Sequence, residues 1–132
     1  LADGTLDFVA TDPAPHEPSM KSGSFDSAAF GTIGMETTLG VLVDGLNKGL
    51  LSQQRFVEVF SLRPAKFLSL PSEFGEFTVG ERFHGILVDP KFPATPVYES
   101  EFSSLSKNSC FTGQSLPGRL KKALHGSLIH TF

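Results

Sequence analysis

The feature that most limits the possible folds is a single short apolar run near the start of the chain. Phe8, Val9 and Ala10 follow one another without polar interruption, which is typical of a parallel strand covered on both faces. We therefore predict a buried strand over residues 5–11, ending just before Asp12. One strand cannot cover both of its own faces, so residues 5–11 are expected to belong to a larger α/β unit.

The rest of the first half predicts a long loop and then helices. Residues 13–31 are rich in Pro, Gly and Ser, and so long a loop is uncommon in a compact domain unless it has a functional role. Apolar residues at helical spacing predict a helix over residues 34–48, with Gly49 as its C-cap. A second helix is expected from an N-cap at Ser52 to about Leu62, and a short one over residues 65–70 after Pro64.

The second half predicts small β elements. Residues 77–79 and 85–90 favour short strands, residues 91–118 are irregular, and residues 119–132 favour a hairpin that turns at residues 125–127. The composition shift near Gly75 divides the chain into residues 1–74 and 75–132. The 132 residues suffice for a core but not for a full (β/α)8 barrel, which needs about 250.

Composition excludes several classes of partner. The net charge of −3 gives no attraction to nucleic acid or to an anionic membrane surface. No apolar run approaches the roughly 20 residues of a membrane span. Cys110 is the only cysteine, so an internal disulfide is excluded and a reducing compartment, the cytoplasm, is favoured.

The residues that favour chemistry lie where the first strand ends. An Asp at the carboxyl end of a parallel strand faces the ligand side of an α/β barrel, where it can bind a metal or act as a base. Asp12 occupies that position, and the prolines that follow hold His16 nearby. On spacing alone, an Asp at a strand end is more often a turn or helix cap.

Residues 10–16 resemble the Ala-Thr-Asp-His-Ala-Pro-His signature of dihydroorotases, which are zinc-dependent cyclic amidohydrolases. Four more segments are similar to family motifs in the same order: residues 28–37, 61–66, 79–90 and 106–113. The resemblance implies a C-terminal fragment of a (β/α)8 metallo-dependent hydrolase. Residues 1–74 would then hold the last barrel strand (5–12) and helices, and residues 75–132 would form part of a small accessory β domain.

The resemblance also implies site residues. Asp12 matches the family aspartate that ligates zinc and shuttles a proton. His16 matches the histidine that binds the substrate carboxylate. Ala28 lies in the segment that matches the loop whose backbone contacts the pyrimidine ring. The implied substrates are dihydroorotate or N-carbamoyl-aspartate, in pyrimidine biosynthesis. One Asp cannot hold a catalytic zinc, so we expect no tight zinc binding and no activity from this chain alone.

Departures from the family pattern keep alternatives open. Pro13, Ala29, Gly85 and Cys110 each replace a residue that is usual in the family. Pro13 and Gly85 favour a second hypothesis, a non-catalytic homologue that serves as a structural partner of aspartate carbamoyltransferase. A third is another cyclic amidohydrolase, such as a dihydropyrimidinase or allantoinase. In each case we expect a homo-oligomer or a missing N-terminal fragment to cover the open strand edge.

Overall fold

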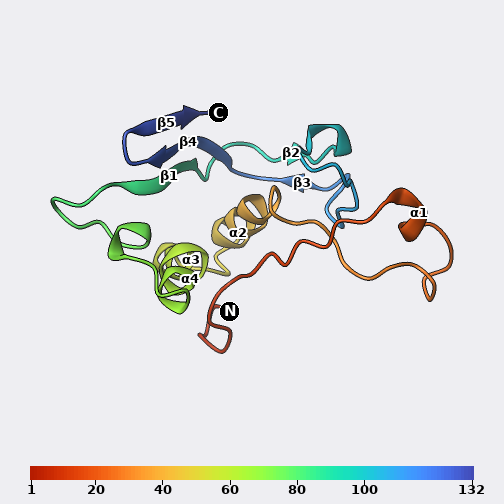
Figure 1. The fold of residues 1–132 in the computed structure, drawn as a ribbon, viewed down its shortest axis with the longest axis horizontal. Helices are drawn as coiled ribbons and strands as arrows, with labels where there is room; N and C mark the ends of the chain where they lie inside the picture. Colours follow the sequence, from red (N-terminus) through yellow and green to blue (C-terminus); the bar gives the residue numbers. More distant parts are fainter.

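The computed structural model describes residues 1–132 and shows a mixed α/β arrangement (Figure 1). An antiparallel sheet and a group of helices lie at one end of an elongated molecule. A loop carrying the short helix α1, Pro18–Lys21, lies at the other end. No helix has the length and apolar character to cross a bilayer.

The first predicted strand is wrong for this chain. Residues 7–17 form no helix or strand, and the one backbone hydrogen bond made by Val9 runs from its N–H to the carbonyl of Val59, at 3.1 Å. The physical reason is that a strand requires a neighbour with a free row of backbone groups, and this chain offers none at that place. The segment is instead held by contacts with helices.

The predicted helix at residues 34–48 is confirmed in a shorter form as α2, Thr38–Asn47. Its end is a Schellman motif. Gly49 has φ +72°, its N–H donates to Leu46 O, and the N–H of Leu50 donates to Gly45 O. Gly49 therefore ends the helix as the sequence predicts.

The next two predicted helices are one continuous helical segment. It comprises α3 (Gln53–Val57), a π-helical turn (Glu58–Leu62) and α4 (Arg63–Phe67). The Ser52 side chain accepts a hydrogen bond from Arg55 N and so caps the start, as predicted. Pro64 has no N–H to donate, and the wider π turn before it lets the helix continue where the sequence predicted a break.

Residue Arg55 joins this helix to the start of the chain. Its side chain is buried and donates to Leu1 O at 2.8 Å and to Leu6 O at 2.6 Å, and it pairs with Glu58 at 3.0 Å. The central apolar cluster of Leu42, Leu51 and Val59 lies beside it. Val9 packs against that cluster, which explains how an unpaired segment keeps its place.

The sheet contains three antiparallel strands in the order β1–β4–β5, namely His84–Asp89, Arg119–His125 and Leu128–Thr131. The predicted hairpin is confirmed, with Gly126 at φ +60° in the two-residue turn. The predicted strand at residues 77–79 is wrong, because residues 77 and 78 pair with no strand and Val79 lies in a turn. Two further strands, β2 (Thr95–Pro96) and β3 (Ser115–Leu116), pair with each other. The 3₁₀ turns are Ser72–Phe74 and Glu99–Glu101.

Few side chains are fully covered. Only nine residues are buried, seven of them apolar. Many large apolar side chains are exposed, including Phe25, Phe30 and Leu105. So many exposed apolar side chains, with so few buried ones, leave much apolar surface that another polypeptide could cover.

Candidate functional site

Asp12 lies in an unusual backbone conformation. Its φ is +36°, in the left-handed region that non-glycine residues rarely adopt, although Asp tolerates it better than most. The residue before a proline normally prefers extended backbone, so Pro13 adds to the strain. The side chain is exposed and forms no hydrogen bond or ion pair within the chain. Strain of this kind is concentrated at functional positions.

A pocket of about 440 Å³ borders Asp12 on the side of the helices. Its other walls come from residues 8–11, from Thr38 at the start of α2, and from Pro64 and Phe67 in α4. The walls are mostly apolar, so Asp12 is the acidic group of this hollow.

His16, four residues after Asp12, contacts the far part of the long loop. Its Nε2 lies 2.7 Å from the backbone oxygen of Phe30, so Nε2 must carry the proton that this contact requires. The ring therefore bridges residue 16 to the far side of the long loop.

The segment around Ala28 is held by a lysine clamp. Lys21 Nζ donates to the backbone oxygens of Ala29 and Gly31, at 2.7 and 3.0 Å. Gly31 has φ +104°, and a Cβ there would lie 2.4 Å from that of Ala14, so only glycine fits. Ala28 is partly buried, and its N–H already donates to Ser24 O at 3.1 Å.

Asn108 connects these pieces and was missed as a site residue by sequence reasoning. Its Oδ1 accepts from His16 N at 3.2 Å, and its Nδ2 donates to Ala14 O at 2.9 Å. Its backbone oxygen accepts from Ile33 N and from Thr32 Oγ1. One residue therefore ties both sides of the long loop together across more than 70 positions of sequence. The available signal was the Ser-Lys-Asn run at residues 106–108.

Ser106 completes this connection. Its hydroxyl lies 3.0 Å from His16 N and donates to His16 O at 2.7 Å, and it also contacts Asn108 Oδ1. Both backbone polar groups of His16 are thus satisfied by side chains from the second half. The result is a preorganised histidine rather than a freely moving one.

The chain does not fit a complete metal centre at Asp12. No group of three or more His, Cys, Asp or Glu side chains is arranged to hold an ion. Catalytic zinc normally takes three protein ligands. His16 and Asp12 are not joined by any hydrogen bond, and each borders a different part of the surface. Asp12 by itself therefore supplies at most one ligand.

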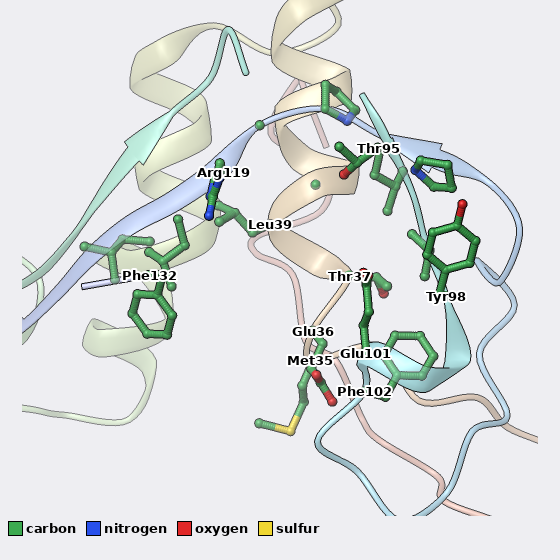
Figure 2. A pocket seen from close by; sticks show the side chains of 18 of the residues that line it. Met35, Glu36, Thr37, Leu39, Thr95, Tyr98, Glu101, Phe102, Arg119 and Phe132 are labelled. Atoms are coloured by element: carbon green, nitrogen blue, oxygen red, sulfur yellow. The ribbon is translucent and has the colours of Figure 1, made fainter. Parts of the chain in front are cut away.

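A larger hollow of about 700 Å³ separates α2 from the β elements (Figure 2). Met35, Glu36 and Phe102 lie at one end, and Leu39, Arg119 and Phe132 lie at the other. An adjoining pocket of about 670 Å³ reaches Pro13 and Pro15. The Glu36 carboxylate accepts from Ser103 N and Ser104 N, at 3.0 and 3.3 Å, so it joins the two halves rather than facing a ligand.

Comparison with known proteins places this geometry in context. No family model matches the chain. A dihydroorotase of Chlorobaculum tepidum is 38% identical over 130 residues, which are 98% of this chain and 29% of that protein. The chain is similar to part of the dihydroorotases. A dihydroorotase of Desulfotalea psychrophila is 41% identical over 118 residues, covering 89% of the chain and 27% of that protein.

The chain spans a little under one third of the length of the dihydroorotases it matches. Among solved structures, an L-hydantoinase (dihydropyrimidinase) of Arthrobacter aurescens superposes with a TM-score of 0.88 at 30% identity. That match covers 97% of this chain and 29% of the hydantoinase. A D-hydantoinase of a Thermus species gives 0.86 at 23% identity and shows the shared fold alone. The relation to cyclic amidohydrolases predicted from the sequence is thereby confirmed.

Proposed function

We propose that this chain is the part of a dihydroorotase-like zinc hydrolase that supplies a carboxylate, a histidine and a substrate loop to a site completed by the rest of the enzyme. Residues 1–74 would be the last βα unit and following helices of the barrel, and residues 75–132 the C-terminal part of the accessory β domain. The reaction would interconvert dihydroorotate and N-carbamoyl-aspartate, in the cytoplasm. The chain alone would be inactive.

The observation that carries this proposal is the frame around His16. Ser106 and Asn108 satisfy its backbone groups, and its ring contacts the backbone oxygen of Phe30 at 2.7 Å. Such a frame holds an imidazole and a loop in fixed relation, as binding a small planar acid requires. A purely structural histidine on an exposed loop has no need of it.

The roles differ between the candidate residues. His16 would bind the substrate carboxylate, and the backbone near Ala28 would contact the ring. Asp12 would ligate the metal and move a proton, with the other metal ligands coming from outside these residues. The exposed side chain and strained backbone of Asp12 support that role.

Two alternatives have their own supporting observations. A non-catalytic homologue, acting as a structural partner of aspartate carbamoyltransferase, is favoured by Pro13 and Gly85, which replace residues usual in the family. Another cyclic amidohydrolase is favoured by the likeness to the L-hydantoinase. In either case the exposed apolar side chains would be covered by other polypeptide, either a second copy or the missing part.

The deciding experiment grafts this chain into the Chlorobaculum tepidum dihydroorotase in place of its matching 130 residues. We expect hydrolysis of dihydroorotate above that of dihydrouracil or allantoin. Asp12→Asn in the graft should lower kcat by about 10²–10⁴-fold, as expected for loss of a proton-transferring carboxylate. Asp26→Asn, an exposed aspartate on the same loop, is the matched control and should leave the rate unchanged.

Other outcomes separate the alternatives. A folded graft that prefers dihydrouracil or allantoin would favour the other amidohydrolases. A folded graft without activity, and without rescue by Pro13→His, would favour the non-catalytic homologue. Equal activity of the Asp12→Asn and parent grafts would contradict the role of Asp12.

A further inference from the structure

Two histidines face each other at the open end of the sheet, far in sequence from Asp12. His84 begins β1 and His125 ends β4, and they are direct cross-strand partners. Their Nδ1 atoms lie 2.7 Å apart, with ring planes at 61°. The spatial pairing was not expected from the sequence, which gives no metal-ligand spacing between these residues.

The His84 ring is held by its neighbours, whereas the His125 ring is accessible to solvent. The His84 side chain is only 9% exposed and stacks on Phe74 with ring centroids 4.5 Å apart. Its Nε2 is buried without a hydrogen bond, and the nearest acidic atom is Glu73 Oε1 at 3.4 Å. His125 is exposed, and both line a hollow of about 470 Å³.

We propose that these two Nδ1 atoms bind a divalent transition-metal ion, at a site separate from Asp12. Metal–imidazole bonds of 2.0–2.1 Å place two ligand nitrogens about 2.9 Å apart at a right angle and about 3.3 Å apart at the tetrahedral angle. The present 2.7 Å needs to open by only a few tenths of an ångström. When the ion binds, the imidazole that now donates from Nδ1 changes tautomer and carries its proton on Nε2, so that both Nδ1 lone pairs are free for the ion.

Glu73 supports this arrangement from the opposite side of the ring. A metal on Nδ1 requires the proton of His84 to sit on Nε2, and Glu73 Oε1, 3.4 Å away, is the acidic atom placed to accept from it. A carboxylate behind a ligating histidine is the common means of fixing its tautomer and raising its basicity.

The chemistry of the pair selects the ion. Imidazole nitrogen suits Cu²⁺, Ni²⁺ and Zn²⁺, whereas Ca²⁺ and Mg²⁺ need oxygen ligands. Because no third protein ligand is arranged around the pair, water completes the coordination shell. The expected affinity order is Cu²⁺ above Ni²⁺ and Zn²⁺, with no binding of Mg²⁺.

The test is calorimetric titration of the 132-residue chain with Ni²⁺ and with Zn²⁺, using Mg²⁺ as the negative control. We expect one ion per chain, retained by Asp12→Asn. His125→Ala should weaken binding by at least about tenfold, and Glu73→Gln by roughly tenfold, the usual effect of an outer partner. His130→Ala, which removes an exposed histidine of β5, is the matched control and should bind as the unsubstituted chain does.

His125 is exposed, so its replacement should preserve the fold, and far-ultraviolet circular dichroism checks this. Histidine ring resonances should shift for His84 and His125 but not for His130. The proposal is overturned if the chain binds no ion, or if His125→Ala binds as tightly as the unsubstituted chain. This proposal does not depend on the proposed function. The graft experiment tests the role of Asp12, whereas the metal titration tests His84 and His125.

Discussion

The N-terminal segment (residues 5–11) and the strand β1 are both short apolar stretches, yet they have different structures. β1 pairs along its whole length with β4, from His84 opposite His125 to Asp89 opposite Arg119. Residues 5–11 have no strand partner, and only Val9 N bonds to a helix carbonyl. The difference lies in what the chain offers as a neighbour.

Each stretch is retained by a different kind of interaction. β1 is stabilised by the backbone hydrogen bonds of an antiparallel ladder. The N-terminal segment is stabilised by side chains, namely Val9 on the apolar cluster and Arg55 on the carbonyls of Leu1 and Leu6. A segment held in this way keeps free N–H and C=O groups that can accept a further strand.

The largest expected effect comes from supplying that missing neighbour. In the graft described above, amide hydrogen exchange over residues 5–11 should slow by roughly 100-fold or more relative to the 132-residue chain. The amides of β1 should change little, because their partner is already present. Mass spectrometry of peptides from the two regions measures both at once. Equally fast exchange of residues 5–11 in graft and chain would contradict the comparison.

A smaller effect tests how the sheet is attached to the helices. Gly118 precedes β4 with φ +83°, and a Cβ there would lie 2.7 Å from Val43 Cγ1 in the buried face of α2. Gly118→Ala should lower the free energy of unfolding by about 2–4 kcal/mol, from backbone strain together with overpacking. Urea denaturation gives the value.

Gly113→Ala is the matched control for that substitution. Gly113 has nearly the same φ, +80°, but nothing lies within 4 Å of a Cβ placed there. It should cost only the backbone strain, about 1 kcal/mol. Similar losses for both variants would mean that the close approach to Val43 has no energetic importance.

Local signals predicted the parts of the fold that depend on nearby residues. Ser52 caps a helix, Gly49 ends one, and Gly126 turns the final hairpin, since each needs only a few residues of context. The strand at residues 5–11 failed because pairing is not local. The break at Pro64 failed because a π turn accommodates a proline, which apolar spacing does not reveal.

The candidate site was predictable in part for the same reason. Asp12 and His16 stand out by their position after an apolar run, but Asn108 acts through contacts with residues more than 70 positions away. Nothing in residues 106–108 alone indicates which loop they will join. The His84–His125 contact likewise follows from strand register, which the sequence left open.

The smallest expected effect comes from protonating Glu58, which pairs with Arg55, the side chain that binds the carbonyls of Leu1 and Leu6. Hydrogen bonds from Gln54 and then Arg55 lower the pKa of Glu58 below its usual 4.5. A lowered folded-state pKa stabilises the fold above pH 4.5, and this contribution is lost as the pH falls through the folded pKa. Glu58→Gln should therefore reduce the drop in urea midpoint between pH 7 and a pH well below 4.5. Glu99→Gln, at an exposed residue without an ion pair, should leave that drop unchanged.

Because Glu58 acts through Arg55, the acid-induced loosening should appear first as faster amide hydrogen exchange in residues 1–11, while β1 keeps its protection. If exchange instead became faster in residues 1–11 and in β1 at the same pH, the two regions would be coupled. The lack of a strand partner would then not be what makes residues 1–11 less stable than β1.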